Sequence, residues 1–202
     1  MKSFLIRHRH HAMMTALLLL IGSVAMLVSG CAVPTWLTDA QSITALVGTS
    51  ITSIGSFIAG LTGNVALAAG LAIVSTWITK VETGLSDIET LVSQYNSSPT
   101  PTLLTDIESA LQDVETNIQQ DFSNLGLPAS VLSVIAGITA LALSQLEAWG
   151  TMIPAVKASA MTVMTLKVPY TKAEYKAAVN KILSTPTGDA EVDAALAKAR
   201  KL

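Results

Sequence analysis

The amino-acid sequence predicts an all-α fold, an elongated helical bundle built around an antiparallel αα-hairpin with short heptad arms. Long apolar runs with helical spacing dominate the chain, and aromatic residues make up only 4% of it. A short unit recurs at intervals of seven residues, which is the period of a coiled coil. Between the repeats, Pro99 and Pro101 interrupt the helix and require a turn. Residues 31–202 have the length of one domain.

The N-terminus has the pattern of a secretory signal. Lys2, Arg7 and Arg9 make it basic, and the apolar residues 12–28 carry no charge. This run is a little shorter than the roughly 20 residues of a stable membrane span. We therefore expect residues 1–30 to be a signal peptide. The run leads into Leu27-Val28-Ser29-Gly30-Cys31, which resembles the lipobox of bacterial lipoproteins.

The lipoprotein resemblance implies that the chain is cleaved before Cys31, whose sulfur receives a diacylglycerol and whose amine is then acylated, with palmitate among the fatty acids. Several buried acyl chains make a stable membrane anchor. Since Ala32 rather than Asp follows the cysteine, the resemblance implies the outer membrane, facing the periplasm, in a Gram-negative host. An ordinary signal peptide or an uncleaved anchor is the alternative.

The composition of the mature chain excludes several kinds of chemistry. His8, His10 and His11 all precede Cys31, which is the only cysteine, so no imidazole and no free thiol would remain. Serine and cysteine catalysis through a histidine base, and zinc sites built on His and Cys, are thereby excluded. Cleavage also removes three of the 12 basic residues and none of the 14 acidic ones, which leaves a net charge of about −5. We expect no enzyme, no metal, no cofactor and no nucleic-acid partner, and we identify no small-molecule substrate.

Four regions are expected: the signal peptide 1–30, a lipid-anchored tether 31–40, a helical bundle 41–168 and a basic helical tail 169–202. Pro34 and Trp36 are expected to keep the tether out of regular helix, with Trp36 either at the membrane interface or packed on the bundle. Residues 41–79 carry no charge and are too long for one span, so they predict two helices that break near residues 60–64. Small residues spaced four apart allow close helix packing.

The clearest pattern lies in residues 80–122. Four copies of one unit begin at Lys80, Asp87, Asp106 and Asp113, and the turn near residues 96–102 separates them into two arms. Apolar positions step by four and three along each arm, which predicts a heptad seam and an antiparallel hairpin. Thr105 and Glu108 resemble a capping box at the start of the second arm. The seam is the candidate surface for a protein partner or for self-association. It comprises Val81, Leu85, Ile88, Val92, Tyr95, Ile107, Leu111, Val114 and Ile118.

The repeated carboxylates do not predict a metal or acid–base site, because Asp87 and Glu89 are two residues apart and diverge on a helix. Residues 129–146 are again uncharged. The order apolar, amphipathic, turn, amphipathic, apolar is a rough mirror about Pro99. Folding at that turn would lay residues 65–78 beside residues 129–146.

The C-terminal part predicts three further helices. The first begins at Pro154 and runs to about Leu166. The second, at 172–183, is capped by Thr171 with Glu174, and the third, at 190–201, is capped by Asp189. The chain from Thr151 onward is predominantly basic, whereas the hairpin is acidic. This tail therefore either docks on the hairpin or reaches anionic lipid or cell wall.

Two functions follow as hypotheses. The first is a lipid-anchored, non-enzymatic protein of the cell envelope, in which the helical bundle is a structural or protein-interaction module. The second is a membrane-inserting protein that uses the uncharged, glycine-rich segments 41–79 and 129–146 to form a pore or plug.

Overall fold

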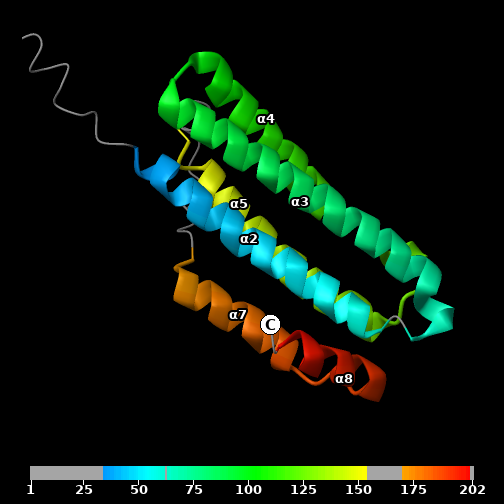
Figure 1. Cartoon of the computed structure of the whole chain (residues 1–202). Helices are drawn as coiled ribbons and strands as arrows, with labels where there is room; N and C mark the ends of the chain where they lie inside the picture. The colour runs from blue at the N-terminus through cyan, green and yellow to red at the C-terminus, as the bar shows by residue number, and fades with distance from the viewer. Residues whose placement is uncertain (1–33, 62, 154–169, 201–202) are drawn as a thin grey trace, which may run out of the picture. The chain divides into compact units, whose positions relative to one another are not determined.

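The computed structural model describes residues 34–61, 63–153 and 170–200, and every regular element within them is a helix (Figure 1). These helices pack on one another as an all-α bundle, which confirms the predicted fold class. The signal peptide, Cys31 and the helix expected from Pro154 to Leu166 lie outside the described residues.

The first helix, α2 (Thr35–Gly60), begins earlier than the sequence predicts. Pro34 precedes it as the capping residue, a position that tolerates the missing N–H of proline, so the expected non-helical stretch up to Ala40 is wrong from Thr35 onward. Trp36 is 4% exposed, which places it in the core of the bundle. At Gly60 the helix ends, and a short 3-10 turn, η1 (Val65–Leu67), follows. The predicted break near residues 60–64 is confirmed.

Helices α3 (Ala68–Ser97) and α4 (Pro101–Ile118) form the predicted antiparallel hairpin. The indole Nε1 of Trp77 donates a hydrogen bond to the Asn117 carbonyl at 2.7 Å, which fixes the register between the two helices. The turn lies where Pro99 and Pro101 predict it. The cap of α4 is Thr100, whose hydroxyl accepts the Leu103 N–H, so the capping box expected at Thr105 is wrong.

Helix α5 (Ala129–Gly150) follows a second 3-10 turn, η2 (Ser123–Leu125), and Gly126, whose φ of +68° suits glycine. α5 packs mainly on α2 and also contacts α4 and α7. The expectation that residues 65–78 lie beside residues 129–146 is therefore wrong. Both segments are packed against α2 instead, as Ile78 near Gly55 of α2 illustrates. The sequence mirror has no counterpart in the packing.

Helices α7 (Lys172–Ser184) and α8 (Ala190–Ala199) have the predicted caps, a capping box of Thr171 with Glu174 and an N-cap at Asp189. They pack on α2 and α5, and not on the acidic hairpin as one alternative predicted. The buried hydroxyls of Ser50 and Tyr175 join α2 to α7 through a 2.9 Å hydrogen bond. Burial of the phenol raises the pKa of Tyr175 to about 12, so it remains neutral.

Helix α2 is the centre of this arrangement, since α3, α5, α7 and α8 all contact it. Small residues make the contacts close, as their spacing predicts. A Cβ atom on Gly60 would lie 2.9 Å from the Cβ of Ala195 on α8. One on Gly70 would lie 2.8 Å from the carbonyl oxygen of Leu125. Glycine at these positions lets two backbones meet.

Three helical stretches are long and apolar enough to cross a membrane, as judged from length and composition alone: Thr35–Gly60, Val65–Ser97 and Ala129–Gly150. In the bundle their apolar faces are turned inward. Their outward faces carry mostly Ala, Ser and Thr, and among the described residues the only large hydrophobic side chains exposed are Val65, Ile73 and Tyr170.

The contact between Gly60 and Ala195 makes a testable prediction. Gly60→Ala should lower the free energy of unfolding by about 1–3 kcal/mol, because the added methyl group overpacks the junction of α2 with α8. Gly48→Ala is the matched control in the same helix, where the new Cβ meets only Leu85 at 3.9 Å. The control should be neutral or stabilising. Urea unfolding followed by circular dichroism measures both, and equal effects would contradict this packing.

Candidate functional site

The heptad positions predicted as a partner surface are buried inside the bundle. Val81, Ile88 and Ile107 are 0% exposed, and the other aliphatic members are no more than 5% exposed. Tyr95 is half-buried, with its ring 5.5 Å from that of Trp36. These side chains hold α3, α4 and α2 together. The seam is therefore not an exposed interaction surface, because the chain itself covers it.

The carboxylates of the repeated unit separate into two sets. Asp87, Asp106 and Asp113 are exposed on the hairpin. The glutamates lie along its flanks, where it meets the next layer of helices. On the α2 side, the hydroxyl of Thr44 donates to Glu89 at 2.7 Å and that of Thr52 donates to Glu82 at 3.1 Å. Glu82 and Glu89 therefore have neutral hydroxyl donors on α2, a helix that has no lysine or arginine.

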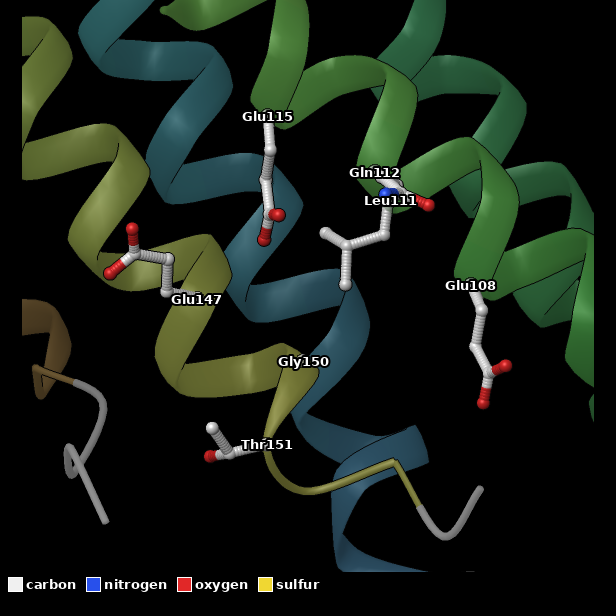
Figure 2. A pocket seen from close by; sticks show the side chains of 7 residues that line it. All are labelled: Glu108, Leu111, Gln112, Glu115, Glu147, Gly150 and Thr151. Carbon is white, nitrogen blue, oxygen red and sulfur yellow. The ribbon is translucent and has the colours of Figure 1, made fainter. Parts of the chain in front are cut away.

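On the opposite flank, glutamates line a groove of about 370 Å³ between α4 and the end of α5 (Figure 2). Glu115 extends from α4 into this space, Glu147 lines it from α5 with its carboxylate turned away from Glu115 in this view, and Glu108 lies farther along α4 beyond Leu111 (Figure 2). Gly150 also lines the groove, and its lack of a side chain lets Leu111 approach closely. A Cβ atom added at residue 150 would lie 3.2 Å from the Leu111 side chain. The groove is thus acidic on both walls.

The surroundings of Glu115 disfavour ionisation of its carboxyl group. Burial, and then the charge of Glu147, raise the pKa of Glu115 above its usual 4.5. The Oε1 atom of Glu108 is buried and accepts no hydrogen bond from the part of the chain that the structure describes. Such an atom costs free energy of folding.

Chemically the groove holds carboxylates and little else. The hydroxyl of Thr151 donates to the Ala148 carbonyl, so it is already committed to the backbone. Among the described residues no cluster of His, Cys, Asp or Glu is arranged to hold a metal ion. Sequence reasoning missed this groove. Its signal was the seven-residue spacing of Glu108 and Glu115, together with Glu147 at the end of an uncharged segment.

Tryptophan side chains mark one end of the bundle. We call it the tryptophan end, made of the first turn of α2, the turn at residues 98–100 and the last turn of α5. The indole of Trp149 donates to the Trp36 carbonyl at 2.9 Å, which joins α5 to α2. The backbone of Tyr170 exchanges two hydrogen bonds with the Gln145 side chain, so α7 also starts toward this end.

Cys31, the predicted lipidation site, lies outside the described residues, four positions before the first residue of α2. The chain matches no protein-family model, no curated protein and no solved structure.

The raised pKa of Glu115 predicts a pH dependence. The Glu115 carboxyl binds its proton more tightly in the folded chain than in the unfolded chain. As pH rises above 4.5 the unfolded chain releases this proton first, so the free energy of unfolding decreases. Glu115→Gln should therefore raise the free energy of unfolding at neutral pH and reduce its decline with pH. Urea titrations from acidic to neutral pH measure this.

Asp193→Asn is a control of opposite sign. Hydrogen bonds from the backbone and side chain of Thr187 hold the pKa of Asp193 below 3.8. The ionised Asp193 therefore adds to the free energy of unfolding above pH 3.8, and this stabilisation is lost as pH falls. This variant should lose stability at neutral pH. A loss of stability at neutral pH in Glu115→Gln would contradict the assignment.

Proposed function

We propose that this protein is a lipid-anchored, non-enzymatic component of the bacterial cell envelope whose helical bundle is a structural or protein-interaction module. The observation that carries the proposal is that the packed bundle begins at Thr35, immediately after the sequence that resembles a lipobox. A compact body joined to a lipidated cysteine by so few residues suits a protein held close to a membrane. In a Gram-negative host, Ala32 favours the outer membrane, facing the periplasm.

A non-enzymatic role is supported by the chemistry of the mature chain. Without histidine or a free thiol, a nucleophile would need a carboxylate, lysine or tyrosine as its base. The buried hydroxyl pair of Ser50 and Tyr175 has no such base beside it, since Tyr175 stays protonated up to a pKa of about 12. The acidic groove offers carboxylates without a nucleophile.

The surface available to a protein partner is the outward face of the hairpin. It carries the exposed carboxylates Asp87, Asp106 and Asp113, while the apolar seam is used internally. A partner, or a second copy, that bound residues 80–122 would meet this polar face.

Membrane insertion is the second candidate, favoured by the three helices that are long and apolar enough to span. Insertion would separate α2 from its neighbours and break the hydrogen bond between Ser50 and Tyr175. It would also turn outward faces rich in Ala, Ser and Thr toward lipid, where large apolar side chains are preferred. The packed bundle is therefore the better-supported form.

Replacing Cys31 separates the two candidates. Cys31→Ser should abolish labelling by radioactive palmitate and release the protein from membranes on extraction with salt, because the acyl chains are its anchor. Ser29→Ala, which keeps a small residue in the lipobox, is the matched control and should retain both label and membrane association.

Either of two results would contradict the proposal. Palmitate that persisted in Cys31→Ser would place the lipid elsewhere. Loss of label without release by salt would favour the membrane-inserting protein.

A further inference from the structure

We infer that the outward face of α7 docks on an anionic lipid surface, so that the bundle is held against the membrane in one orientation. The inference deepens the proposed function and rests on it, since it assumes the acyl chains on Cys31. It names a second contact with the membrane, formed by side chains of the folded bundle. We call this surface the α7 face: Tyr170, Lys172, Ala173, Lys176, Ala177 and Lys181.

Charge is the first support. Lys172, Lys176 and Lys181 are exposed and make no ion pair with any residue that the structure describes. At 100° per residue, Lys172 and Lys176 lie on one edge of the helix and Lys181 on the other, with Ala173 and Ala177 between them. Long lysine stems flanking small apolar residues let the ammonium groups reach headgroups while the helix lies flat on the surface.

The acidic residues near this face offset its charge only in part, because α7 itself carries three lysines and one glutamate, a net charge of +2. Glu174 accepts the backbone N–H and the hydroxyl of Thr171. Asp189 caps α8. Asp193 accepts from Thr187. These bonds lower the pKa values of Glu174 and Asp193, so both carboxylates remain negatively charged at neutral pH, held by Thr171 and Thr187.

Position is the second support. Three residues lie between Cys31 and Thr35, the start of α2, and a fully extended chain over these four steps spans at most about 14 Å. The lipid therefore holds the tryptophan end close to the membrane. α7 starts toward that end, where Tyr170 is bonded to Gln145 of α5. Helix α3, with 30 residues, extends about 45 Å from that end. Its first residues, at the end of the hairpin opposite the turn at residues 98–100, are therefore out of reach of the tether.

Tyr170 adds a third feature at the same place. Its side chain is 42% exposed, and it is one of only three large hydrophobic side chains exposed among the described residues. Tyrosine is favoured at the headgroup level of a bilayer, where its ring is buried and its hydroxyl remains wet. The opposite side of the bundle, the hairpin, carries Asp87, Asp106 and Asp113, which an anionic surface repels.

The test uses the lipidated protein with one new cysteine, Ala173→Cys on the α7 face or Ser86→Cys on α3, each labelled with a fluorophore. Both positions are exposed. The probe is a vesicle of phosphatidylcholine, alone or mixed with phosphatidylglycerol, that carries a nitroxide on its headgroups. In the anionic vesicles, quenching at residue 173 should be several times that at residue 86. Replacing Lys172, Lys176 and Lys181 together by Gln should abolish the difference.

Lys80→Gln is the matched control, an exposed lysine on the hairpin whose loss should leave the quenching unchanged. Equal quenching at the two positions, or quenching at residue 173 that survives the triple replacement, would overturn the inference. Stronger quenching at residue 173 than at residue 86 in vesicles of phosphatidylcholine alone would also overturn it.

Mass spectrometry of the same samples keeps the two proposals distinguishable. Protein that carries acyl chains but has no preference for the α7 face overturns the docking and leaves the proposed function intact. Protein without acyl chains overturns the proposed function. Docking is then tested by flotation of that protein with the anionic vesicles, where each lysine should contribute about fivefold to binding. Binding that the triple replacement leaves unchanged overturns the docking.

Discussion

Burial of the apolar face of helix α2, which has no charged residue after Asp39, is the constraint on which the rest of the structure depends. Its side chains Ile51, Ile54 and Phe57 are 0% exposed, and each such side chain contributes roughly 1.5–3 kcal/mol when removed from water. One helix alone cannot cover another on every side, so the hairpin, α5 and the pair α7 and α8 surround it. A segment that has the length and composition of a membrane span is thereby packed against four other helices of the chain.

The acidic repeat is compatible with this apolar centre because its residues point in three directions. Isoleucine and valine fill the core, aspartates face solvent, and glutamates border the neighbouring layer. On the α2 flank, threonine hydroxyls satisfy Glu82 and Glu89 without introducing a charge into α2. On the α5 flank, Glu108 Oε1 is buried without a hydrogen-bond partner among the described residues, and burial and the charge of Glu147 disfavour ionisation of Glu115, which leaves an electrostatic cost on this side.

Charge is distributed over opposite sides of the bundle. The hairpin is acidic, the outward side of α7 carries three lysines, and α2 and α5 lie between these layers (Figure 1). Because exposed ion pairs contribute little to stability, this asymmetry is better understood as a means of orientation. In the lipid-anchored protein that we propose, such a charge distribution would orient the bundle, since the lipid alone would restrain its position and leave its rotation free.

The sequence by itself determined the local features: the all-α class, the break after Gly60, the turn at Pro99 and the caps at Thr171 and Asp189. These depend on neighbouring residues along the chain, which sequence reasoning reads directly. Only the tertiary structure decided that α5 packs on α2, that α2 begins before Ala40, that the heptad seam is covered and that the charge of Glu147 acts on Glu115. The hydrophobic effect has no direction, so the sequence does not say which apolar helix packs on which. The pairing depends on the shapes of the helix surfaces and on close contacts at glycine, which only the folded structure shows.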